Sequence, residues 1–115
     1  MHSEGRAIFA SGSPFAPCKV LGKKFIPGQC NNSYIFPGVG LGVTFARATR
    51  VTEAHFIMAA HAVADAVTEE RLERGCLFPP LASIRDVSLE IATRGSASVL
   101  GRPDIGSLEV GKCAD

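Results

Sequence analysis

The chain has 115 residues, of which 46% are hydrophobic and 20% are charged, and its formal net charge is +1. This composition indicates one small globular domain and excludes a two-domain enzyme, because the apolar residues suffice for only a modest core. The basic residues are neither clustered nor interleaved with aromatic residues, so no binding of nucleic acid is expected.

The four cysteines and the N-terminus bear on the cellular compartment. The cysteines form no C-x-x-C motif and lie far apart, at Cys18, Cys30, Cys76 and Cys113. The N-terminus has no charged-then-apolar leader, and no apolar run is long enough to span a membrane. We therefore expect reduced thiols, a cytoplasmic protein and no association with membranes.

The first expected element is a strand at residues 6–10. This short apolar run is closed by Ser11-Gly12-Ser13-Pro14, a pattern that favours a buried strand of a parallel sheet. The carboxyl ends of such strands line ligand crevices, which makes Ser11 and Gly12 candidate binding residues. An ordinary turn explains these residues equally well. A second short extended segment is expected at residues 24–26.

The next segment carries the strongest site candidates, Asn31 and Asn32. They stand at the expected start of a helix, where free backbone N–H groups bind anions. Their amide side chains are neutral donors suited to a carboxylate, although simple helix capping explains them as well. The helix itself, within residues 31–48, is predicted to be buried nearly all round, with Pro37 in its first turn. Its glycines at 38, 40 and 42 miss the G-x-G-x-x-G spacing and indicate close helix packing.

Three further helices are expected downstream. Thr52 caps the first, whose apolar stripe is Phe56, Ala60, Val63 and Val67, widened by Ala59 and Ala66. Thr68 caps the second, where Glu70 and Arg74 can pair and Gly75 ends the helix. Ser83 caps the third, with a stripe of Ile84, Val87 and Ile91.

No metal site is expected in these helices. His55 and His61 are six residues apart and lie on different faces, unlike the i, i+4 pair of a zinc helix. Asp65 lies one turn after His61 and can pair with it, but two ligands do not make a site.

Three motifs together resemble the malic enzymes. They are GRAIFASGSPF at 5–15, PGQCNNSYIFPGVGLG at 27–42, and GCLFPPL at 75–81 with IRDVS at 84–88. The resemblance covers about residues 4–93. It implies the C-terminal part of a Rossmann-like NAD(P)-binding domain from an enzyme that oxidatively decarboxylates malate to pyruvate, using NAD or NADP and a divalent metal. By this resemblance, Asn31 and Asn32 match an amide pair of which at least one contacts malate, and Ser11 and Gly12 lie near the cofactor.

The chain also departs from the family pattern. Cys30 stands where the family usually has glycine. The catalytic tyrosine and lysine, the metal-binding carboxylates and the nucleotide-binding glycine loop have no counterparts, so no catalytic or metal residues are assigned and no turnover by this chain alone is expected. Residues 92–115 resemble instead the end of metal-dependent amidohydrolases, which suggests a chimera with domains at 1–93 and 94–115.

The sequence thus predicts a mostly helical α/β fragment, with one or two short strands followed by three or four helices. The first function hypothesis is a malic-enzyme part that binds malate or a similar small carboxylate. The alternative is a non-enzymatic module that self-associates as a homo-oligomer, since a lone strand exposes unpaired edges and apolar faces. An amidohydrolase-related protein is a third hypothesis, which rests on the tail alone.

Overall fold

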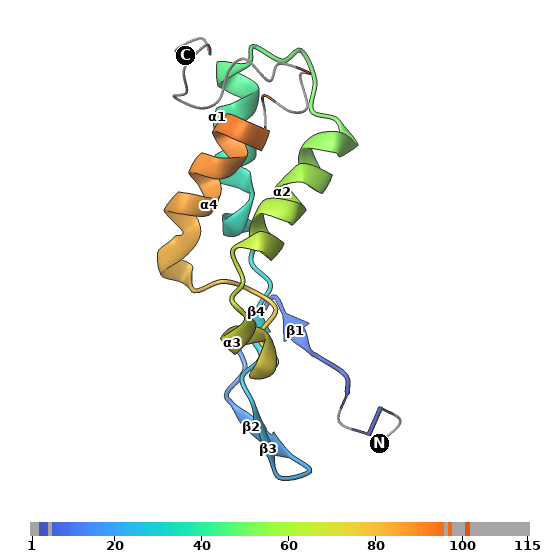
Figure 1. The fold of residues 1–115 in the computed structure, drawn as a ribbon. Helices are drawn as coiled ribbons and strands as arrows, with labels where there is room; N and C mark the ends of the chain where they lie inside the picture. The colour runs from blue at the N-terminus through green and yellow to red at the C-terminus, as the bar shows by residue number, and fades with distance from the viewer. Residues whose placement is uncertain (1–2, 5, 96, 98–100, 102–115) are drawn as a thin grey trace.

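The structure is a computed structural model that describes residues 3–4, 6–95, 97 and 101, apart from the side chain of residue 94. Helices α1 (Phe36–Phe45), α2 (Glu53–Asp65) and α4 (Ile84–Glu90) gather at one end of the molecule, and a β-hairpin lies at the opposite end (Figure 1). The prediction of a small, mostly helical α/β fold is confirmed. None of the helices in the described residues is long and apolar enough to cross a membrane.

Two short strands from different parts of the chain pair in parallel. Strand β1 (Ala10–Ser11) lies beside β4 (Gly28–Gln29), with Ala10 opposite Gly28 and Ser11 opposite Gln29. The strand expected at residues 6–10 therefore begins only at its last residue. Its partner offers two residues, so Ile8 and Phe9 have no ladder partner in the described chain and stay 46% and 57% exposed.

The excursion between these strands folds into the hairpin. Strand β2 (Cys18–Val20) pairs antiparallel with β3 (Lys23–Phe25), which confirms the extended segment expected near residue 24. Leu21 and Gly22 form its two-residue turn with φ of 50° and 77°. Positive φ at both turn residues matches the right-handed twist of the paired strands.

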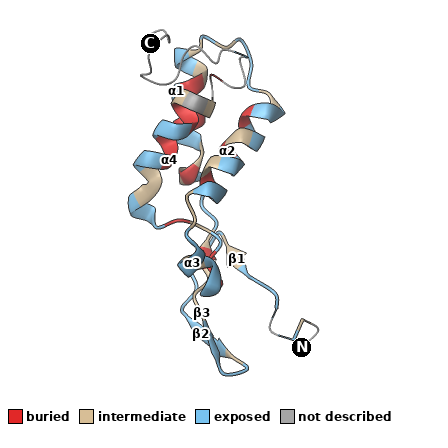
Figure 2. Ribbon diagram, viewed as in Figure 1, coloured by how far each residue is buried: buried red, intermediate tan, exposed pale blue. Residues whose placement is uncertain are grey.

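Helix α1 follows a single 3₁₀ turn, η1 (Asn32–Tyr34), and has Pro37 in its first turn as predicted. The prediction of all-round burial is wrong, because α1 packs on one side only, against α4 and the π-helical turn η3 (Ile91–Gly95). Much of the remaining surface of α1 is exposed (Figure 2), and three large side chains of this helix, Phe36, Leu41 and Phe45, are 48–74% exposed.

Helix α2 begins after Thr52, as expected, and the predicted burial of Ala59 and Val63 is confirmed, whereas that of Phe56 and Ala60 is wrong. Its buried residues are His55, Ala59 and Val63, whereas Phe56 is 44% exposed and Ala60 is exposed. His55 can be buried because its ring Nδ1 lies 2.8 Å from the Thr52 hydroxyl, close enough for a hydrogen bond. The inward face therefore keeps Ala59 and Val63 of the predicted stripe and takes His55 in place of Phe56.

The remaining two helices lie where the sequence predicts them, although the Thr68 side chain makes no capping hydrogen bond to the first. Helix α3 (Glu69–Glu73) is followed by the predicted Glu70–Arg74 ion pair, at 2.8 Å, and by Gly75 with φ of 73°. Ser83 precedes α4 at the end of a 3₁₀ turn, η2 (Leu81–Ser83), but its side chain makes no capping hydrogen bond. The core between the helices consists of Tyr34, Val39, Ala59, Val63, Val87 and Ile91 (Figure 2).

Candidate functional site

The parallel pairing of β1 and β4 brings the two candidate segments to one edge. Ser11 ends β1, and Gln29 opposite it ends β4. Beyond the strands, the Cys30 backbone N–H donates to the Ser11 carbonyl at 2.7 Å, and the Gln29 side-chain amide donates to the Gly12 carbonyl at 3.2 Å. Since the carboxyl ends of parallel strands form ligand crevices, this edge is the natural place for a site.

Asn31 caps the 3₁₀ turn η1 at this edge. Its side-chain oxygen accepts a hydrogen bond of 2.9 Å from the Ser33 backbone N–H, and the Tyr34 N–H donates to the Asn31 carbonyl. The capping interpretation is therefore correct, and two backbone N–H groups expected to face an anion are already used. What remains for a ligand is the Asn31 side-chain NH₂, which donates no hydrogen bond to the described residues.

Asn32 offers a second amide. It is exposed, and its side chain makes no hydrogen bond within the described part of the chain. Both residues line a cavity of about 330 Å³. The other lining residues are Cys30, Tyr34, Ile35, Ala60, Val63, Ala64, Leu77 and Phe78. We call it the Asn cavity.

Leu77 and Phe78 of the GCLFPP segment, to which the sequence assigned no local role, also line the Asn cavity. The Tyr34 hydroxyl donates a hydrogen bond of 2.7 Å to the Pro79 carbonyl, and the Tyr34 ring stacks on Phe78 with centroids 5.7 Å apart. Burial raises the pKa of the Tyr34 hydroxyl, and the nearby Arg71 guanidinium opposes this shift. No local pattern signals these contacts, because they join residues far apart in the chain.

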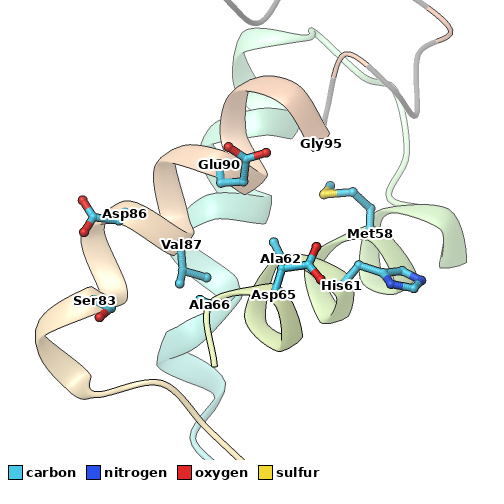
Figure 3. Close-up of a pocket in the computed structure, with 10 residues that line it drawn as sticks. All are labelled: Met58, His61, Ala62, Asp65, Ala66, Ser83, Asp86, Val87, Glu90 and Gly95. Carbon is cyan, nitrogen blue, oxygen red and sulfur yellow. The ribbon is translucent and has the colours of Figure 1, made fainter. Parts of the chain in front are cut away.

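A second, larger cavity of about 570 Å³ lies between α2 and α4. His61 and Asp65 project from α2, while Asp86 and Glu90 project from α4 (Figure 3). His61 and Asp65 form no ion pair with each other in the described structure, contrary to the pairing that their spacing allows. Three carboxylates around one cavity repel an anion, so this cavity does not suit a carboxylate substrate.

The remaining sequence features are structural where they are described. Gly38 and its neighbours lie inside α1, not in a strand-to-helix turn, so they form no phosphate loop. A Cβ on Gly38 would lie 2.7 Å from the Ile91 Cβ, which confirms close packing, whereas Gly40 faces open space.

No group of three or more His, Cys, Asp or Glu among the described residues fits a metal ion, so the family's divalent metal has no ligand set there. Cys18, Cys30 and Cys76 are free thiols, and Cys113 lies outside the described residues.

Comparison with known proteins decides the family. The model of the malic enzyme NAD-binding domain matches residues 1–99. The chain belongs to the malic enzyme family. It is 52% identical over 101 residues to the chloroplastic NADP-dependent malic enzyme of Zea mays, an alignment that covers 86% of this chain and 16% of that protein. NADP-dependent malic enzyme 3 of Arabidopsis thaliana is 50% identical over 109 residues, with 88% of this chain and 18% of the relative covered.

The same comparisons also bear on the predicted compartment and on the predicted boundary at residue 93. The chain spans less than a fifth of the length of these malic enzymes. A third relative, the chloroplastic NADP-dependent malic enzyme of Oryza sativa subsp. japonica, is covered to 15%. The expectation of a cytoplasmic protein was wrong, because several of the similar enzymes are chloroplastic. The family match extends to residue 99, past the boundary expected at 93, and most of the amidohydrolase-like segment lies outside the described residues.

Proposed function

We propose that this chain carries part of the carboxylate-binding site of a malic enzyme, with the Asn31 and Asn32 side-chain amides as donors to malate. The observation that carries the proposal is that Asn31 and Asn32 both line the Asn cavity, directly after the end of β4. Since Asn31 uses its oxygen for the Ser33 cap, its NH₂ group is left to donate. A carboxylate has acceptor atoms only, and it matches a pair of such donors.

Substitution by aspartate tests this assignment sharply. Asn31→Asp keeps an oxygen for the Ser33 N–H but replaces the NH₂ donor with a negative charge. Asn32→Asp makes the same replacement at the uncapped position. We expect malate to bind the unmodified chain weakly, with a Kd of roughly millimolar order, and to bind neither variant detectably.

The measurement is a titration of the isotopically labelled chain with malate, followed through the NMR signals of the two side-chain amides. Glu69→Gln on α3 is the matched control for a change of one charge away from the site. Selective shifts of both signals in the unmodified chain, with no malate-induced shift of the one asparagine that remains in each aspartate variant, support the proposal. Equal shifts in an aspartate variant and in the unmodified chain would refute it.

The nucleotide is proposed to lie beside Ser11 and Gly12, on the same edge as the Asn cavity. Support comes from the Cys30–Ser11 and Gln29–Gly12 hydrogen bonds, which hold the two segments together. The names of the similar enzymes favour NADP over NAD. Addition of NADP to the same labelled chain should shift the Ser11 and Gly12 backbone signals, and addition of malate alone should not.

We expect no malate-dependent reduction of NADP by the purified chain. Oxidative decarboxylation needs an acid–base pair and a metal that polarises the carbonyl. The catalytic tyrosine, lysine and carboxylates of the family have no counterparts in the sequence. Malate-dependent reduction above the rate of an Asn31→Ala, Asn32→Ala double variant would contradict this expectation.

A second candidate function is self-association as a non-enzymatic homo-oligomer. It is supported by large apolar side chains of α1 and α2 that are 44–74% exposed, namely Phe36, Leu41, Phe45, Phe56 and Ile57. Large exposed apolar surface marks an interaction site when it is contiguous. A chimera in which the residues after 93 come from an amidohydrolase-like sequence remains part of this second proposal, and sequencing of the flanking genomic DNA tests it.

A further inference from the structure

Arg71 in α3 makes two specific contacts with the segment that follows its helix. Its Nε donates to the Phe78 carbonyl at 2.8 Å, and its Nη2 donates to the Cys76 sulfur at 3.0 Å. The Cys76 thiol in turn points to the Phe78 carbonyl, at 3.5 Å. The planar guanidinium thus holds both ends of residues 76–78 at once, a geometry that the single ammonium of a lysine does not reproduce.

The segment held by Arg71 touches the chain on both sides of the asparagine pair. Before the pair, it packs on β4, where a Cβ on Gly28 would lie 3.1 Å from the Phe78 ring and 3.6 Å from the Cys76 sulfur. After the pair, Phe78 stacks on Tyr34 and Pro79 accepts the tyrosine hydrogen bond. Asn31 and Asn32 lie between these two anchor points in the sequence, and Leu77 and Phe78 line the Asn cavity together with them.

We propose that Arg71 is a positioning residue for the Asn31–Asn32 amide pair, acting through residues 76–79. This inference rests on the proposed function, because the pair is assigned there to the substrate carboxylate. Arg71 does not line the Asn cavity and is not expected to touch the substrate. Its role is to fix the distance between the wall of the cavity and the two donors, since a small displacement of binding groups costs a large part of their effect.

The test compares Arg71→Met with Arg74→Met. Methionine keeps most of the apolar stem and removes the guanidinium in both variants. Arg74 is a matched control from the same helix end, because its guanidinium lies on the surface and pairs only with Glu70 among the described residues. We expect Arg71→Met to weaken the binding of malate roughly tenfold and Arg74→Met to leave it within about twofold.

A ligand-free measurement separates failure of this inference from failure of the proposed function. In the absence of malate, Arg71→Met should shift the side-chain amide signals of Asn31 and Asn32 and speed the hydrogen exchange of the Ser33 backbone amide, which the Asn31 cap protects. These changes are expected even if the unmodified chain binds no malate. If the unmodified chain binds no malate, the proposed function is refuted, but the positioning role of Arg71 is not.

Two milder variants decide the question if Arg71→Met does not fold. Arg71→Lys keeps the positive charge but loses the planar guanidinium that donates two hydrogen bonds at once. Tyr34→Phe keeps the ring but loses the hydrogen bond to Pro79. Both should shift the same asparagine signals in the folded protein. Unchanged asparagine signals in the folded Arg71 variants, or equal shifts in Arg74→Met, would overturn the assignment of Arg71 as a positioning residue.

Discussion

The hydroxyl of Tyr34 donates a buried hydrogen bond of 2.7 Å to the carbonyl oxygen of Pro79, 45 residues further along the chain. This bond joins the turn that carries the asparagine pair to the segment that closes the Asn cavity. It also ties the strand end of the molecule to the helical core, because Tyr34 is itself a core residue with only 4% of its surface exposed. The bond therefore contributes both to stability and to the shape of the candidate site.

Tyr34→Phe should lower the free energy of unfolding by about 1–2 kcal/mol. The substitution keeps the stacking on Phe78 and leaves the Pro79 carbonyl without its donor, so its cost is that of one buried hydrogen bond. Urea denaturation followed by circular dichroism measures the change. A Thr44→Val variant, which removes an exposed hydroxyl bonded within α1, should cost less. If both variants lose the same free energy of unfolding, the buried Tyr34 hydrogen bond contributes no more to stability than the exposed one at Thr44.

The same tyrosine predicts a loss of stability at alkaline pH. Burial raises the pKa of Tyr34 in the folded protein, whereas in the unfolded chain the pKa is about 10. Below the unfolded value the hydroxyl is protonated in both states and its full contribution is present. As the pH rises through the unfolded value towards the folded one, the unfolded chain loses its proton first, and this contribution is lost.

This pH dependence is measurable because Tyr34 is the only tyrosine and the chain has no tryptophan. Tyrosinate absorbance therefore reports one group. The titration midpoint should lie higher in the folded chain than in urea. The difference in unfolding free energy between the unmodified chain and Tyr34→Phe should shrink above about pH 10. A folded midpoint equal to the one in urea would contradict the prediction.

Two glycines of α1 make opposite predictions for the same substitution. Gly38→Ala should destabilise the protein by about 1–3 kcal/mol, because its Cβ would lie 2.7 Å from the Ile91 Cβ and 2.8 Å from the Ser88 carbonyl oxygen. Gly40→Ala places its Cβ in open space and should stabilise the helix by about 0.5–1 kcal/mol. Thermal unfolding of both variants tests the pair, and a melting temperature raised by Gly38→Ala would contradict the close approach of α1 to Ser88 and Ile91.

The sequence predicted local features well where they depend on neighbouring residues. The stop at Gly75, the Glu70–Arg74 pair and the buried stripe of Val87 and Ile91 are all confirmed. The first depends on a backbone conformation that favours glycine and the second on contacts within one turn, while the stripe follows from apolar residues at helical spacing.

Features that depend on contacts between distant parts of the chain were less predictable. The inward face of α2 passes through His55, which an apolar pattern does not select and which is satisfied by Thr52. The length of β1 is limited because its partner β4 offers only two residues, and the local pattern at residues 6–10 does not reveal the length of that partner. For the candidate site, the sequence and its resemblance singled out Asn31 and Asn32, but not Arg71 and Tyr34, whose contacts give this segment its fixed position.

The exposed side of α1 predicts concentration-dependent self-association. Leu41 and Phe45 are four residues apart on one helical face, and they are 48% and 74% exposed. Phe45→Asn should shift sedimentation towards the monomer and change the free energy of unfolding by no more than about 0.5 kcal/mol, because the side chain makes little contact in the monomer. Leu21→Asn is the matched control, since Leu21 is 72% exposed in the hairpin turn at the opposite end of the molecule. An equal shift in both variants would mean that general surface hydrophobicity, and not the face of α1, drives association.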